Sequence, residues 1–168
     1  MTLPLWDREA FNPETTMKIS SHADKISRLL ELRDRLDPLE DFELWYWTSL
    51  TAGTNIWNAT LHAAGLTSEE RAFSTIPGVH VVPQDDGSWR RELRGPGDVS
   101  HVGWPPIPGD LPQPIQRLEA ALHALEEHRD PCLRGGRTPT RAIVEDCDRA
   151  ILQALSVYQA WVHQEVPS

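Results

Sequence analysis

The segment from Leu44 to Leu66 constrains the fold of this chain more than any other. Its sequence, LWYWTSLTAGTNIWNATLHAAGL, contains no aspartate, glutamate, lysine or arginine, whereas 24% of the whole chain is charged. Read as a helix, the segment has uncharged side chains on every face. A helix without a charged face is usually buried on most of its sides, so we expect this helix to lie at the centre of the fold.

Polar residues recur along this expected helix at a spacing of three and four, which places them on one face. They are Thr48, Thr51, Asn55, Asn58 and His62. Each needs a partner in a core, because an unpaired buried polar group costs about 1–3 kcal/mol. The stripe therefore fits a satisfied polar layer or dimer seam, a pocket for a small molecule or metal, or a membrane span. The asparagines, the histidine and the absence of flanking lysine or arginine clusters disfavour the span.

Two helices are expected before the middle of the chain. Apolar spacing predicts the first over about residues 16–36, and Ser21 with Asp24 resembles a capping pair near its start. Pro38 breaks this helix and can begin the next one, which ends near Gly65. The short break predicts that the two helices pack as an antiparallel pair.

Two more helices are expected in the second half of the chain. Apolar residues spaced three and four apart predict a helix that begins at Pro112 or Pro114. The fourth helix is predicted to start at Thr138-Pro139, an N-cap residue followed by a first-turn proline, and to run to about His163.

The stretch over residues 67–112 differs from the helical regions. The sequence GVHVVPQDDGSWRREL predicts a small β-hairpin with Asp86-Gly87 as its turn. The part that follows is dense in glycine and proline, so we expect an irregular loop. His101 and Trp104 in this loop are candidate ligand contacts, with packing anchors as the alternative.

These elements predict one all-α domain over residues 1–168. The expected architecture is a four-helix bundle made of two helical hairpins, with the partly irregular insertion at 67–112 between its second and third helices. Residues 1–15 form an N-terminal arm in this interpretation. The wide apolar helix faces favour a homodimer.

Composition limits the partners and the compartment. The net charge of −9 and a pI near 5.2 disfavour nucleic acid as a partner. Cys132 and Cys147 form neither a metal-type pair nor a disulfide framework, and the first residues do not read as a signal peptide. We therefore expect a cytoplasmic protein with no membrane partner and with reduced thiols, and no cofactor is predicted.

A metal site is one candidate centre. His62, Glu119, His123 and Glu126 are suitable ligand types. Di-iron bundles carry a Glu-x-x-His pair on each of two helices, whereas this chain has only Glu119-x-x-x-His123. The alternative is that these are ordinary polar residues at a helix seam or surface.

An anion site is a second candidate. It would use Arg129, Arg134, Arg137 and Arg141, which surround Gly135-Gly136 before the fourth helix. Helix N-termini and arginine side chains both bind carboxylates and phosphates. The alternative is that these arginines pair with the acidic residues nearby, namely Asp130, Glu145, Asp146 and Asp148.

Residues 129–134 resemble a motif of the HEPN class of small helical bundles, some of which are RNases. That motif has an arginine, a polar residue and a histidine a few positions on. Arg129 and Asp130 match its start, but Arg134 stands where the histidine is needed and Pro131 lies between. The resemblance implies a nuclease as an alternative, against which the acidic net charge speaks.

The function we expect from the sequence is a non-catalytic module that binds a ligand or a second copy of itself along the polar stripe. The first alternative is a small enzyme with a pocket between the second, third and fourth helices, which would use His62, His123 and a glutamate with or without metal. The second alternative is the HEPN-like nuclease. Motifs for a nucleophilic serine or a phosphate loop do not occur in the sequence.

Overall fold

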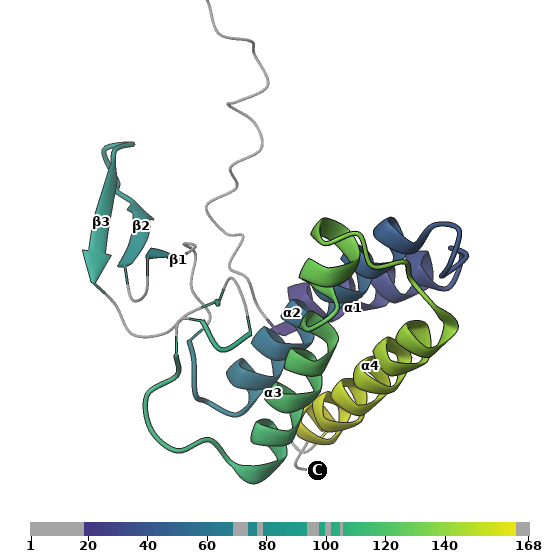
Figure 1. Cartoon of the computed structure of the whole chain (residues 1–168). Helices are drawn as coiled ribbons and strands as arrows, with labels where there is room; N and C mark the ends of the chain where they lie inside the picture. Colours follow the sequence, from purple (N-terminus) through teal and green to yellow (C-terminus); the bar gives the residue numbers. More distant parts are fainter. Residues whose placement is uncertain are drawn as a thin grey trace, which may run out of the picture.

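The computed structural model describes residues 19–68, 74–76, 79–93, 98–99, 102–104 and 106–163. Within these residues the chain is mostly helical, as the sequence predicts (Figure 1). The order of elements is α1 (Ile19–Arg33), α2 (Phe42–Ala63), β1 (Ser74–Ile76), β2 (Val79–Pro83), β3 (Trp89–Leu93), α3 (Gln113–Glu126), the π-helical turn η2 (Asp130–Arg134) and α4 (Arg141–Val162). The predicted N-terminal arm over 1–15 and His101 lie outside the described residues.

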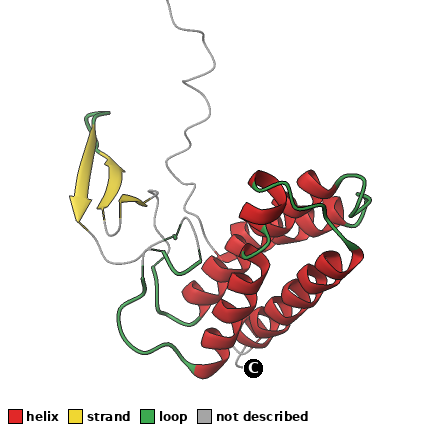
Figure 2. Ribbon diagram, viewed as in Figure 1, coloured by secondary structure: helices red, strands yellow, loops and turns green. Residues whose placement is uncertain are grey.

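The four helices gather into one body, and the strands lie to one side of it (Figure 2). α1 packs on α2, α3 packs on α4, and α2 also contacts both α3 and α4. The helix that holds the charge-free segment is therefore the element that the other three share. Of its 22 residues 16 are buried, which explains why it carries so little charge. No helix in the described part of the chain is both long and apolar enough to cross a membrane.

The core forms two neighbouring clusters, and α2 contributes to both. Ile56, Trp57 and Leu61 belong to one cluster. Trp45 and Tyr46 belong to the other. α2 and α3 approach closely at Gly53, where a Cβ atom would lie only 2.9 Å from Cδ2 of the fully buried Leu122. The interface between these helices is thus filled by leucine side chains.

A buried arginine joins three of the helices. Nε of Arg33, in the last turn of α1, donates a hydrogen bond of 2.6 Å to Oγ of Ser49 on α2. Its guanidinium also forms an ion pair with Asp148 on α4 and lies 4.3 Å from the ring centre of Trp45. This side chain fixes α1 against the other two helices.

Helix starts differ from the sequence-based expectation at three places. α4 begins at Arg141 and its N-cap is Thr140, whose hydroxyl accepts from the Ile143 amide, so the predicted start at Thr138 is wrong. Ser21 lies within α1, which is already helical at Ile19, and therefore does not cap it. α2 begins at Phe42 and not at Pro38.

The late start of α2 follows from the turn before it. The Asp37 carboxylate accepts the backbone amides of Leu39 and Glu40 at 2.9 Å each. An aspartate that binds its own downstream amides stabilises a turn and delays the helix.

The three strands form an antiparallel sheet in the order β1-β2-β3. β2 pairs with β3 in a register that places Val81 opposite Arg91, and the chain reverses at 84–88. Gly87 has a φ of 81° there, and Oδ1 of Asp86 accepts from the Ser88 amide at 2.9 Å. The third strand, β1, was not expected from the sequence.

Candidate metal centre

The polar stripe of α2 is partly satisfied by its own helix. The hydroxyls of Thr48 and Thr51 donate to the carbonyl oxygens of Leu44 and Trp47, four residues earlier. Ser49, Thr54 and Thr60 make the same kind of bond. Such bonds remove the need for a partner elsewhere. Among the described residues, three members of the polar stripe reach other parts of the chain, namely Asn55, Asn58 and His62.

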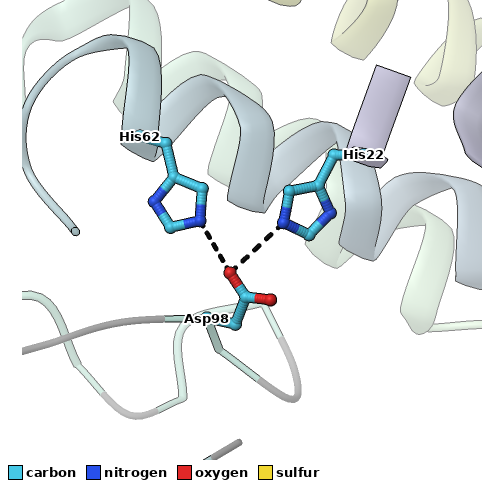
Figure 3. A group of neighbouring side chains, drawn as sticks. All are labelled: His22, His62 and Asp98. Atoms are coloured by element: carbon cyan, nitrogen blue, oxygen red, sulfur yellow. Dashed lines mark hydrogen bonds and ion pairs between the residues drawn. The ribbon is translucent and has the colours of Figure 1, made fainter. Parts of the chain in front are cut away.

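His62 meets His22 of α1 and Asp98 of the loop before α3. Nε2 of His62 lies 2.6 Å from Oδ1 of Asp98, and Nε2 of His22 lies 3.2 Å from the same oxygen. Figure 3 shows both rings pointing at this one carboxylate. The ring centroids are 5.5 Å apart. Each of the three residues is at most 7% exposed, so two imidazoles and a carboxylate converge on a buried point.

The outer ring nitrogens of both histidines are also occupied. Nδ1 of His62 lies 2.7 Å from the hydroxyl of Thr67, and Nδ1 of His22 lies 2.9 Å from Oδ1 of Asn55. Ligating histidines in proteins use the second nitrogen in this way, which fixes both the ring orientation and the tautomer.

Asn55 determines which nitrogen of His22 carries a proton. Its Nδ2 donates to the Thr51 carbonyl at 2.8 Å, so its Oδ1 is the atom that faces the ring. A carbonyl oxygen only accepts, which means that Nδ1 of His22 is the donor. In a neutral ring the other nitrogen, Nε2, then presents a lone pair to the Asp98 carboxylate. Two lone pairs 3.2 Å apart need a proton or a cation between them.

The hydroxyl of Thr67 leaves His62 adaptable. A hydroxyl both donates and accepts hydrogen bonds, so Nδ1 of His62 can either accept a hydrogen bond from Thr67 or donate one to it. Nε2 therefore presents a proton to Asp98 in one tautomer and a lone pair in the other.

Asn58 positions the carboxylate. Its Nδ2 donates to the Val99 carbonyl at 3.0 Å, and its Oδ1 accepts from the Val99 amide at 2.8 Å. This two-bond clamp holds the backbone next to Asp98 against α2. It also explains why an asparagine occurs on this face, because both of its polar atoms are buried and paired.

The electrostatics of the centre favour an ionised Asp98. Burial acts to raise the pKa of this carboxyl, but the hydrogen bonds from His22 and His62 and the charges of these rings hold it below its ordinary value. A buried carboxylate beside two imidazole nitrogens is a ligand set that binds zinc, iron and related divalent ions.

The distances are compatible with such an ion. A tetrahedral ion with bonds of about 2.0–2.1 Å separates its ligand atoms by roughly 3.3 Å. Ligand atoms of the three residues all lie within 4.8 Å of one another. The His22–Asp98 distance of 3.2 Å already fits, whereas the 2.6 Å between His62 and Asp98 is a hydrogen-bond distance that a bound ion would lengthen.

The other predicted metal ligands lie elsewhere. Glu119, His123 and Glu126 are neighbours on α3, with His123 Nδ1 3.3 Å from Glu126 and Nε2 3.9 Å from Glu119. The His123 side chain is about half exposed, and a Cβ atom on Gly103 would lie 3.2 Å from its Nε2. No contact in the described part of the chain joins these residues to His62.

Of the four predicted anion-site arginines, two lie beside the same carboxylate. Arg129 and Arg134 both lie beside Asp130, at 3.6 and 3.4 Å. Arg137 and Arg141 are exposed. Arg141 lies instead near Asp37. The six residues that resemble the HEPN motif lie after α3 and form the turn η2 together with its N-cap, Arg129.

Trp104, the remaining predicted ligand contact, is 53% exposed.

The sequence interpretation missed His22, Thr67 and Asp98 as site residues. A signal for His22 was available, because it lies three residues after Ile19 and four before Ile26, on the apolar face of α1. Asp98 carries no such signal, since it belongs to a loop 76 residues from His22.

The two cysteines offer no comparable centre. Both are free thiols, and Cys147 is fully buried in the core. Burial raises the pKa of Cys147 to about 12, which leaves its thiol protonated and unreactive at neutral pH.

Comparisons of the chain with protein-family models, with curated proteins and with solved structures find no match.

Proposed function

We propose that the protein binds one divalent transition-metal ion through Nε2 of His22, Nε2 of His62 and the carboxylate of Asp98. The observation that carries this proposal is the convergence of three buried ligand atoms from three separate elements, α1, α2 and the loop before α3. Residues close in sequence often lie on one surface by chance. Buried ionisable side chains from three distant segments seldom cluster without a functional role.

A purely structural hydrogen-bond network explains less of the geometry. With the tautomer set by Asn55, His22 can donate to Asp98 only when it carries two protons and a positive charge. A divalent ion accepts the lone pairs of both rings and of the carboxylate at once. Asn55 and Thr67 then act as the outer partners that such ligands require.

Three protein ligands leave at least one coordination position for another molecule. Catalytic zinc sites have this property, whereas structural zinc sites use four protein ligands. We therefore assign the protein to the class that binds a small oxygen- or nitrogen-donor molecule on a metal. This assignment agrees with the ligand-binding role expected from the polar stripe of α2. A metal-assisted enzyme, the first alternative from the sequence, would use the same centre.

Metal analysis of full-length variants tests the proposal. The protein is purified without chelators and its zinc, iron, cobalt, nickel and manganese are quantified, and stripped protein is then titrated with Co²⁺, whose visible spectrum reports coordination. We expect about one ion per chain in the unmodified protein and a loss of this ion in His22→Ala and Asp98→Ala.

His123→Ala is the matched control, because it removes a histidine from the other predicted ligand set. Full metal content in this variant is expected. Retention of metal by both His22→Ala and Asp98→Ala, or its loss only in His123→Ala, would overturn the assignment.

The predicted homodimer and cytoplasmic location stay proposals. Leu44 projects from α2 with 54% of its surface exposed, which supports an apolar contact with a second copy. The free thiols of Cys132 and Cys147 fit a reducing compartment. Light scattering coupled to size-exclusion chromatography tests the dimer, and Leu44→Ser is expected to weaken it.

A further inference from the structure

A separate cavity of about 230 Å³ lies between α2 and the end of α3. Trp47 and Leu50 provide apolar walls, and Glu126 and Arg129 contribute charged groups. Asn55 also lines the cavity, but both polar atoms of its side chain bond to His22 and Thr51. The cavity is smaller than typical pockets for drug-sized ligands, so it suits a molecule of amino-acid size.

Arg129 lines this cavity, and one of its donors has no hydrogen-bond acceptor. Its Nε is buried and makes no hydrogen bond, and the carboxylate of Asp130, with which it forms an ion pair, is 3.6 Å away. The Arg129 side chain lines the cavity and is about one-third exposed. A buried unpaired donor of a charged group is costly, and an incoming carboxylate is the acceptor that a guanidinium binds best.

Glu126 gives the cavity a second, opposite charge. Its side chain is about three-quarters buried, and its Oε2 lies 3.3 Å from Nδ1 of His123. No ion pair joins Glu126 to Arg129 in the described structure. Each charge has a partner on its other side, His123 for Glu126 and Asp130 for Arg129. Two opposite charges that line one small cavity without pairing with each other are suited to a ligand that carries both charges itself.

We infer that this cavity binds a free α-amino acid with an apolar side chain. The carboxylate of the ligand lies at Arg129, its ammonium group lies at Glu126, and its side chain packs on Trp47 and Leu50. Trp47 is 43% exposed before binding, and an aromatic wall of this kind favours an apolar group. The inference does not depend on the metal centre.

Calorimetric titration of the chelator-treated full-length protein tests this inference. L-phenylalanine is compared with hydrocinnamate, which lacks the ammonium group, and with phenethylamine, which lacks the carboxylate. L-leucine is the aliphatic probe. We expect the amino acid to bind about 10-fold or more tightly than either half-ligand, because each removes one charge-assisted contact.

Variants identify the residues that hold the ligand. Arg129→Met and Glu126→Gln are each expected to weaken phenylalanine binding about 10-fold. Arg134→Met and Glu127→Gln are the controls, since both alter exposed side chains outside the cavity, and their affinity is expected to match that of the unmodified protein.

Titrations of the unmodified protein test the inference even if a variant folds poorly. Absence of phenylalanine and leucine binding, or equal affinity for phenylalanine and both half-ligands, overturns the inference. Because the metal has been removed from all samples, these outcomes are independent of whether His22, His62 and Asp98 bind an ion.

Discussion

Asn55 shows how a single residue outside a ligand set determines its chemistry. It holds Nδ1 of His22 protonated, and it does so only because its own amide is oriented by the Thr51 carbonyl. We predict that Asn55→Ala lowers Co²⁺ or Zn²⁺ affinity about 10- to 100-fold, the usual effect of losing an outer partner.

Competition with a chromophoric chelator measures this affinity. Thr51→Ala is the control, because the Thr51 hydroxyl bonds only its own helix and the carbonyl that orients Asn55 is retained. Equal affinity in Asn55→Ala and the unmodified protein would show that this hydrogen bond does not set the tautomer.

Asp98 gives the metal-free protein a defined dependence of stability on pH. Its pKa in the folded state is lower than in the unfolded chain, because both histidines bond to the ionised form. A carboxyl with a lowered folded pKa contributes stability above its ordinary pKa, and this contribution is lost as pH falls through the folded pKa.

We therefore predict that Asp98→Asn is less stable than the unmodified protein at pH 6 to 7 and that the difference narrows below about pH 4. Urea unfolding of metal-free samples across this range measures the effect. If the difference in the free energy of unfolding between the two proteins stays constant below pH 4, the ionised form of Asp98 is not preferentially stabilised in the folded state.

At the scale of elements, the start of α4 depends on one capping residue. Thr140 adopts an extended backbone conformation, and its side chain accepts from the Ile143 amide. We predict that Thr140→Ala lowers the free energy of unfolding by about 0.5–1 kcal/mol. Thr138→Ala should change the free energy of unfolding by no more than about 0.5 kcal/mol. A larger loss in Thr138→Ala would indicate that α4 begins at Thr138, as predicted from the sequence.

The attachment of α1 to α4 depends on the Arg33–Asp148 pair. Arg33 is 9% exposed, so Asp148→Ala leaves its charge buried with fewer partners. We predict a loss of about 2–3 kcal/mol in the free energy of unfolding, less than for fully buried pairs because Asp148 is about half exposed. Adding Arg33→Met should recover part of this loss, since it removes the stranded charge.

Asp146→Ala is the matched control on the same helix, because Asp146 pairs with the exposed side chain of Arg149. Its effect should stay within about 0.5 kcal/mol. If the double variant proves less stable than Asp148→Ala alone, the stabilisation from Arg33 comes mainly from packing on Trp45.

At the scale of the whole molecule, the metal centre links α1, α2 and the loop that holds Asp98. An ion that binds only the folded state stabilises it by about 2.7 kcal/mol when its free concentration is 100 times the dissociation constant. For a chain of this size we predict a rise of roughly 5–10 °C in the melting temperature of stripped protein on adding Zn²⁺.

Differential scanning calorimetry with and without zinc measures the shift. His22→Ala should abolish it, and His123→Ala should retain it, since His123 lies in the separate cluster on α3. An equal shift in all three proteins would assign the stabilisation to zinc bound elsewhere.

Features that depend on neighbouring residues could be predicted from the sequence alone. The absence of charge from 44–66 predicted the most buried helix, and helical apolar spacing predicted the other three. The turn at Asp86-Gly87 follows from residues that bond to their own backbone or accept a positive φ. Such properties are local, so they can be inferred from spacing and residue type.

Which polar residues meet could not be predicted from the sequence, because it depends on how the helices and loops pack. The polar stripe was visible in the sequence, but its members divide between bonds to their own helix and bonds to distant elements. His62 and Asp98 are 36 residues apart and His22 and Asp98 are 76 apart, and no spacing rule connects them. Their meeting depends on how α1 packs on α2 and on the clamp between Asn58 and Val99, which are consequences of the complete fold.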